Sequence, residues 1–228
     1  MVASSDLNQI ALKQLRLDVL PSVTHKAFLR CIHLSFFSSD NWYLAGGTAL
    51  SLQAGHRQSV DLDFFTSQKT FDEKRTEEIL SETKKWETSS LARNTLYGKF
   101  FNAKISLIAY PFFRPAEPFL QIGTVQVLTP LDIAAMKIVA ISQRGRKRDF
   151  IDLYWLCRNR LTLYESLERA EHQYKVKQNR NHLLKSLVYF EDAEADPMPT
   201  IFFDADWATV KNYFLTEVPI LAKKILGL

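Results

Sequence analysis

The chain has 228 residues, of which 46% are hydrophobic, so it can bury a substantial core and is not intrinsically disordered. The net charge of +4 and the pI of about 9.0 fit a polyanionic partner, although many soluble proteins are equally basic. Two cysteines without ligand-like spacing exclude a disulfide framework, and no apolar run is long enough to span a membrane. The first residues do not form a signal-peptide pattern, so we expect a cytoplasmic protein without membrane contact.

The first elements of the chain are predicted to be helices, followed by a glycine turn. Apolar residues at helical spacing predict two helices between residues 7 and 37, separated at Pro21. A short apolar run then predicts a strand that stops at Gly46 and Gly47, and residues 48–56 predict a short helix directly after them. The order is therefore strand, glycine turn and helix.

Residues 60–66, VDLDFFT, alternate between carboxylates and apolar side chains. In a strand this period of two places Asp61 and Asp63 on one face and Leu62 and Phe64 on the other. Further along, residues 71–87 predict a charged helix, and the segments 97–110 and 122–128 predict more strands.

The second half of the chain is predicted to be helical. Thr129 and Pro130 suit a helix cap followed by proline at the first helical position. A polar loop over residues 191–199 precedes a last helix from about Asp206 to Leu226. The other helix candidates are residues 130–142, 148–157, 163–174 and 181–190. The predicted fold class is α+β: residues 1–128 form a small mixed β-sheet core flanked by helices, and residues 129–228 form a helical lobe.

Charge is unevenly distributed over this helical half. Residues 137–185 hold twelve Lys and Arg against five Asp and Glu, whereas residues 191–206 hold six acids and no base. The basic block is either a solvated helical face or a nucleic-acid surface, and its composition does not decide between them.

Two carboxylates on one strand face repel each other, and a shared divalent cation removes that cost. Mg²⁺ or Mn²⁺ suits Asp61 and Asp63, because carboxylate and phosphate oxygens together complete its coordination in nucleotidyl transfer. An Asp-x-Asp pair alone is weak evidence, since strand residues alternate anyway. The glycine turn strengthens it, because glycines allow close backbone approach and helix-opening amides attract phosphate.

Two stretches together resemble one family. Residues 43–65, YLAGGTALSLQAGHRQSVDLDFF, and residues 131–156, LDIAAMKIVAISQRGRKRDFIDLYWL, are similar to the two signatures of AbiEii-type nucleotidyltransferase toxins, in the polymerase-β-like nucleotidyltransferase superfamily. The resemblance implies two lobes with a cleft that receives a nucleoside triphosphate and an acceptor. It also implies a toxin of a bacterial toxin–antitoxin or phage-defence system, a cognate antitoxin as partner, and tRNA 3′ ends as acceptors.

The resemblance also assigns roles to individual residues. Asp61 and Asp63 match the metal ligands, and Lys137 matches a lysine near the phosphates. Asp152 matches an essential acid of the second signature, so the expected catalytic residues are Asp61, Asp63, Lys137 and Asp152. The expected nucleotide-binding residues are Gly46, Gly47, Thr48, Ser59 and Lys137. His56 and Arg57 belong to the first signature and are expected to support the site by fixing the loop.

The residues of the second signature have physical roles that the sequence leaves open. Lys137 interrupts an apolar helical stretch, which suits a charge that reaches into a cleft or one that extends to solvent from a helix edge. Asp149 and Asp152 share a helix face, where either could bind metal, act as a base, or pair with Arg144 and Arg148. We favour Asp152 for chemistry and Asp149 for holding an arginine.

One departure from the superfamily concerns the third carboxylate that a later strand commonly supplies. The matching segment, residues 102–110, contains Lys104 and Ser106 and no acid. Asp152 could replace it, the nucleotide phosphates could complete the site, or the enzyme could be weak. The alternative functions are therefore a non-catalytic module that binds RNA or an antitoxin, and a metal-dependent nuclease.

Overall fold

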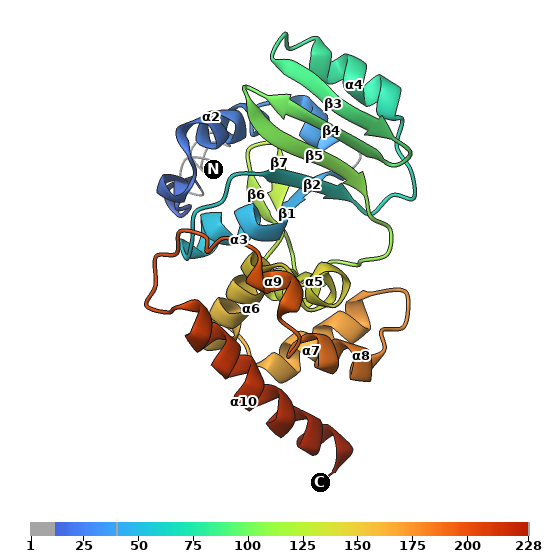
Figure 1. The fold of residues 1–228 in the computed structure, drawn as a ribbon. Helices are drawn as coiled ribbons and strands as arrows, with labels where there is room; N and C mark the ends of the chain where they lie inside the picture. The colour runs from blue at the N-terminus through green and yellow to red at the C-terminus, as the bar shows by residue number, and fades with distance from the viewer. Residues whose placement is uncertain (1–11, 40, 228) are drawn as a thin grey trace, which may run out of the picture. The chain divides into compact units, whose positions relative to one another are not determined.

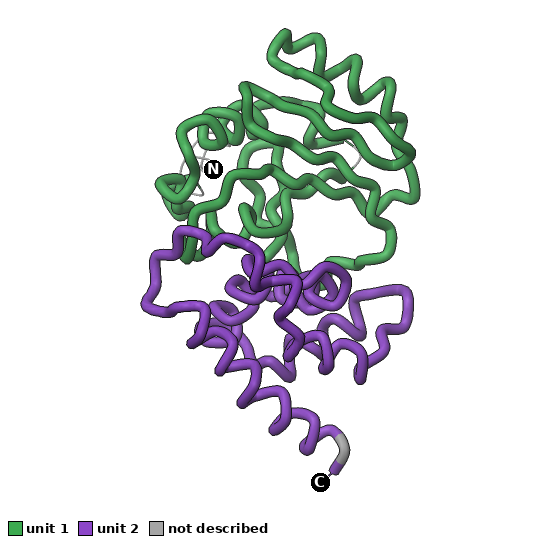
Figure 2. Tube along the Cα trace, viewed as in Figure 1, with its two compact units in different colours: residues 1–129 green, residues 130–228 purple. Residues whose placement is uncertain are grey.

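The computed structural model describes residues 12–39 and 41–227. The chain divides into two compact units, residues 1–129 (unit 1) and residues 130–228 (unit 2), shown in different colours in Figure 2. Unit 1 combines a sheet with helices, whereas the regular structure of unit 2 in the described residues is helical. The prediction of a mixed sheet core followed by a helical part is confirmed.

Unit 1 is built on one sheet in the strand order β3-β4-β5-β2-β1-β7-β6 (Figure 1). The pairs β2–β5 and β1–β7 are parallel and the other neighbours are antiparallel. Burial alternates along β2 as predicted, because Leu62 and Phe64 are fully buried while Asp63 is half-buried on the other face. The strands are β1 (Tyr43–Ala45), β2 (Leu62–Thr66), β3 (Trp86–Ala92), β4 (Thr95–Phe100), β5 (Ala103–Ala109), β6 (Leu120–Ile122) and β7 (Val125–Val127).

Three α-helices of the described residues pack against this sheet. Helix α2 (Ser22–Cys31) packs on β5, α4 (Glu73–Ser81) on β3 and β4, and α3 (Gly46–Ala54) on β1 and β2. Residues 7–11, with which the first predicted helix begins, lie outside the described residues. The described end of that prediction contains only a few helical residues and the short 3₁₀ helix η1 (Leu17–Val19). The second predicted helix ends at Cys31 and is followed by a second 3₁₀ helix, η2 (Ser35–Ser38).

The predicted helix over residues 71–87 is wrong at its end. Helix α4 stops at Ser81, where the hydroxyl of Thr83 donates a hydrogen bond to the Leu80 carbonyl (2.6 Å) and Lys84 adopts φ +55°. This turn reverses the chain, so Trp86 begins strand β3 instead of continuing the helix. Only Trp86 of β3 is buried, which explains why an edge strand made of polar residues carries no period-two signal.

Unit 2 contains helices where the sequence predicted them, but the helix predicted over residues 181–190 ends at Ser186. Two further local differences occur. Pro130 is the first residue of α5, but the Thr129 hydroxyl is buried and has no hydrogen-bond partner among the described residues, so it does not cap that helix. The predicted polar loop begins with a single helical turn, α9. Within the described residues, no helix is both long and apolar enough to cross a membrane. The helices are α5 (Pro130–Arg144), α6 (Lys147–Asn159), α7 (Leu163–Gln173), α8 (Arg180–Ser186), α9 (Glu191–Glu194) and α10 (Trp207–Leu226).

Candidate active site

The predicted site residues of unit 1 gather around the turn between β1 and α3. Gly46 adopts φ +69°, a left-handed conformation that favours glycine, and this turn leads directly into α3. A Cβ atom at Gly46 would lie 3.5 Å from Asp63 Oδ2, so the turn runs beside the β2 carboxylate. Ala45, at the N-cap, gives α3 no side-chain cap.

Arg57 packs directly onto this turn. Its side chain is only 4% exposed, and its Nη1 donates a hydrogen bond to the Gln58 carbonyl (2.9 Å). A Cβ atom at Gly47 would lie 2.1 Å from Arg57 Nη2, so a guanidinium group occupies the space that a side chain at position 47 would need. The neighbouring His56 is also buried. The turn therefore combines the start of a helix with a positive charge, and the two together suit phosphate.

Thr48 and Ser59, both predicted to bind nucleotide, make hydrogen bonds within the protein. The Thr48 hydroxyl lies 2.8 Å from the Ser59 hydroxyl and donates a hydrogen bond to the backbone carbonyl of Asp61. Both side chains are buried. They connect the first turn of α3 to the segment that leads into β2 and so position Asp61.

Asp61 lies directly before β2, and Asp63 lies within it. Asp61 Oδ1 is buried and accepts no hydrogen bond from the residues that the structure describes. An unpartnered buried carboxylate oxygen is costly unless another group binds it, and a hard divalent cation prefers oxygen ligands of this kind. Asp61 and Asp63 therefore fit a divalent cation that is completed by ligand oxygens.

The later strand that commonly supplies a third carboxylate in the superfamily, here β5, places no acid beside Asp63. Strand β5 runs parallel to β2, and Ser106 is paired with Asp63 in register. Lys104, which precedes it on the same face, is exposed. The residues described by the structure contain no group of three or more His, Cys, Asp and Glu side chains that could hold a metal ion. Among the described residues, Asp61 and Asp63 are thus not joined by a third carboxylate from β5.

The predicted site residues of unit 2 form a buried charge cluster between α5 and α6. Lys137 Nζ lies 2.7 Å from Asp149 Oδ1 and 2.6 Å from Asp152 Oδ2, and all three side chains are at most 5% exposed. Arg144 Nε also binds Asp149 Oδ2 (3.0 Å). Burial alone would raise the pKa of Asp149, but the charges of Lys137 and Arg144 outweigh it and lower this pKa. Lys137 therefore does not extend to solvent.

Two details of this cluster differ from the sequence predictions. Asp149 binds Lys137 as well as an arginine, so it is not reserved for arginine. Arg148, the second arginine considered, is exposed and forms no ion pair with a described residue. Sequence reasoning also missed Asp132, a fully buried carboxylate on α5 that accepts a hydrogen bond from Gln173 on α7 (2.6 Å). Like Lys137, it is a charge within an apolar helical run, and that signal was available.

Replacing Gly47 by alanine tests the packing of Arg57. We expect Gly47→Ala to lower the free energy of unfolding by about 1–2 kcal/mol, because the buried guanidinium must move from the position of the new methyl group. In an Arg57→Ala background the same change should cost less than about 0.5 kcal/mol, since the space is then vacant and Gly47 has no positive φ. Urea unfolding of the four proteins measures this cycle, and additive losses would contradict the contact.

Comparison with known proteins places this arrangement in a family. The family model described as nucleotidyl transferase AbiEii toxin, type IV TA system, matches residues 28–100 and 103–224. A protein of Aquifex aeolicus (strain VF5) is 34% identical over 182 residues, which cover 78% of this chain and 87% of that protein.

Two solved structures share the fold. MenT4, a nucleotidyltransferase toxin of Mycobacterium tuberculosis H37Rv, aligns with a TM-score of 0.51 at 14% identity, over 96% of this chain and 90% of that one. A protein from H. pylori aligns with a TM-score of 0.52 at 17% identity, over 89% and 95% of the two chains. The two signatures, the glycine turn beside paired carboxylates and the family match over most of the chain lead to one conclusion. The chain belongs to the AbiEii nucleotidyltransferase toxin family of type IV toxin–antitoxin systems.

Proposed function

We propose that this nucleotidyltransferase uses Mg²⁺ or Mn²⁺ to transfer a nucleoside monophosphate from a nucleoside triphosphate to RNA, with the 3′ end of tRNA as acceptor. The observation that carries the metal dependence is the buried, unpartnered Asp61 Oδ1 in the segment beside the glycine turn. Since Asp61 and Asp63 are the only carboxylates of this turn region in the described structure, the triphosphate itself must complete the cation site.

In this proposal, different groups of unit 1 bind the triphosphate and the cation. The backbone amides of Gly47 and Thr48 and the guanidinium of Arg57 bind the triphosphate end of the nucleotide. Asp61 and Asp63 hold the cation, which when bound stabilises the negative charge on the phosphoryl oxygens. Thr48 and Ser59 keep Asp61 in place through their hydroxyl groups.

The reaction is an in-line displacement at phosphorus. The 3′ hydroxyl oxygen of the acceptor forms a bond to the α-phosphorus, the bond from that phosphorus to the α–β bridging oxygen breaks, and pyrophosphate leaves. The hydroxyl proton is lost to solvent. Nothing in this step requires a covalent enzyme intermediate, so positioning and charge are what the side chains contribute.

Lys137 and Asp152 enter the proposal through their match to the second family signature. Within unit 2 Lys137 is neutralised by Asp149 and Asp152, so the cluster brings no excess positive charge to a phosphate. We propose that Lys137 contributes a hydrogen-bond donor in the reaction, and that Asp152 fixes its position.

The biological setting is also part of the proposal. Membership in a toxin family of type IV toxin–antitoxin systems supports growth inhibition as the consequence of transfer, and a cognate antitoxin as partner. MenT4 is itself a nucleotidyltransferase toxin. Because its sequence identity to this chain is low, the structural similarity supports the shared fold alone. A role in phage defence follows from the same family resemblance.

A transfer assay tests the proposal. The purified full-length protein is incubated with each α-labelled nucleoside triphosphate in turn, deacylated tRNA or total RNA, and Mg²⁺, Mn²⁺ or excess chelator. We expect label on RNA that migrates more slowly, and no label when the metal is chelated. Absence of label with every triphosphate, under conditions where a related enzyme works, would refute RNA as acceptor, and shortened RNA would indicate a nuclease.

A further inference from the structure

The face of the sheet that carries Asp63 continues as an exposed surface onto β5 and β4. Ser106 on β5 is paired with Asp63 on one side and with Tyr97 of β4 on the other, so these three residues lie in one row across the sheet. In the next row Lys99 of β4 is directly opposite Lys104 of β5. Tyr97 is 43% exposed, and both lysines are exposed. An aromatic ring and two cations therefore adjoin the carboxylate site.

The opposed lysines are unfavourable for the fold on their own. Like charges directly opposite each other on an antiparallel pair destabilise a sheet by a few tenths of a kcal/mol. Neither Lys99 nor Lys104 forms an ion pair with a described residue, although Glu87 of β3 is opposite Lys99 and Asp63 lies in the adjoining row. The sheet keeps a repulsive pair at its exposed face, and an anionic ligand would remove this repulsion.

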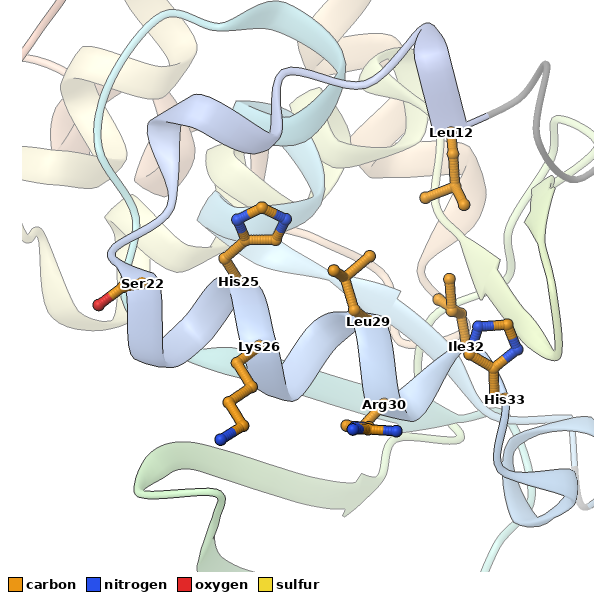
Figure 3. Close-up of a pocket in the computed structure, with 8 residues that line it drawn as sticks. All are labelled: Leu12, Ser22, His25, Lys26, Leu29, Arg30, Ile32 and His33. Atoms are coloured by element: carbon orange, nitrogen blue, oxygen red, sulfur yellow. The ribbon is translucent and has the colours of Figure 1, made fainter.

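The turn that joins these two strands extends the positive charge. Phe101, at the tip of the β4–β5 hairpin, lies under Lys26 Nζ at 5.2 Å and under the Arg30 guanidinium at 5.8 Å. Figure 3 shows both cations extending from one side of α2 and His25 and Leu29 pointing to the other side, and all four residues are among those that line a cavity of about 480 Å³. Neither Lys26 nor Arg30 has an ion-pair partner in the described part of the chain. The hairpin tip thus adds two cations and an aromatic ring.

We propose that this hairpin surface, formed by Lys26, Arg30, Tyr97, Lys99, Phe101 and Lys104, binds a single-stranded segment of the RNA acceptor and leads its end toward Asp63. The lysines and Arg30 contact backbone phosphates, and Tyr97 stacks on a base. This inference rests on the proposed function for the identity of the acceptor. A nucleoside triphosphate fits this surface less well, because the proposed triphosphate site is formed by the amides after Gly46 and the Arg57 guanidinium. A single nucleotide is also too short to contact both rows of side chains and the hairpin tip.

The decisive variant is Lys99→Gln/Lys104→Gln in the full-length protein. Its affinity for a labelled single-stranded oligoribonucleotide and for deacylated tRNA, measured by fluorescence anisotropy without triphosphate, is expected to fall roughly ten- to thirtyfold. The slope of log Kd against log salt should decrease by about 1.4, because about 0.7 is lost for each phosphate contact on a single strand. The melting temperature should stay the same or rise, since the repulsive pair is gone.

Matched variants separate this site from a general charge effect. Lys69→Gln/Lys74→Gln removes two exposed lysines of the same unit elsewhere and should leave RNA affinity within about twofold of the parent. Glu87→Gln should strengthen RNA binding, because it removes the acid opposite Lys99. Tyr97→Leu should weaken binding about tenfold, whereas Tyr97→Phe, which keeps the ring, should not.

Several outcomes would overturn the inference. An equal loss in Lys69→Gln/Lys74→Gln, or a loss only in Lys175→Gln/Lys177→Gln on unit 2, would place RNA on another surface. A raised KM for the triphosphate with an unchanged KM for RNA would assign the lysines to the nucleotide. Unchanged RNA affinity with lost binding of the purified antitoxin would assign the surface to a protein partner. Because binding is measured without catalysis, a protein that binds RNA here but transfers no label would refute only the proposed function.

Discussion

Asp61→Asn is expected to lower kcat/KM for nucleotidyl transfer by roughly a thousandfold while leaving the protein folded. The amide keeps the shape of the side chain but loses the charge that binds a divalent cation, and removal of one electrostatic contact in an active site costs about a hundred- to a thousandfold. Asp63→Asn should behave in the same way. The double variant should be little worse than either single one, because the two carboxylates act as one unit.

The same variants separate metal binding from folding. Asp61 Oδ1 has no hydrogen-bond partner among the described residues, so its replacement removes no internal contact of that atom and the melting temperature without metal should not fall. Mg²⁺ or Mn²⁺ together with a triphosphate should raise the melting temperature of the parent but not of Asp61→Asn. Ser59→Ala is the control: it loses the hydroxyl contact to Thr48, which costs about 1 kcal/mol of stability, but keeps both carboxylates.

Activity in Asp61→Asn within tenfold of the parent would refute this account of the metal site. A strong loss of activity in Ser59→Ala that is restored by higher metal concentration would support the positioning role of Thr48 and Ser59. If the loss persisted at every metal concentration, these hydroxyl groups would be direct nucleotide ligands, as the sequence alone suggested.

The elements that carry the site could be predicted because their signals are local. Alternation of Asp61 and Asp63 with buried Leu62 and Phe64 specifies a strand with one polar face, and Gly46 specifies a turn that few other residues could adopt. Apolar periodicity likewise located the helices of unit 2. These elements can be predicted without knowing which other elements pack against them.

The contacts that define the roles of the residues could not be predicted, because they depend on tertiary approach. The Arg57 guanidinium occupies the space that a side chain at position 47 would need, and the sequence contains no periodic pattern that relates these two residues. The row from Asp63 through Ser106 to Tyr97 depends on strand order, which places β5 between β2 and β4. Strand β3 was missed because an edge strand with only Trp86 buried resembles a polar loop.

Lys137→Met should have the largest effect on stability. It removes the cation that two fully buried carboxylates, Asp149 and Asp152, share, while Arg144 still binds Asp149, and removing one partner of a buried ion pair costs about 3–5 kcal/mol. Asp152→Asn in the same background should recover at least half of this loss, because Asp149 then retains Arg144 and no second charge is buried beside it. Urea unfolding of the two single variants and the double variant measures the coupling.

The pH dependence of Lys137→Met should have the opposite sign to that of the parent. In the parent the pKa of Asp149 is lowered on folding, so its contribution is present above the unfolded value of about 4 and is lost as the pH falls through the lower folded value. In Lys137→Met, burial and the neighbouring carboxylate should raise the pKa of one acid, so the variant should gain stability as the pH falls from 7 toward about 4. A variant whose stability does not rise as the pH falls from 7 toward about 4 would show that Asp149 and Asp152 do not depend on Lys137 for their charge. A loss of stability below about 1 kcal/mol at pH 7 would show that the cluster is open to water.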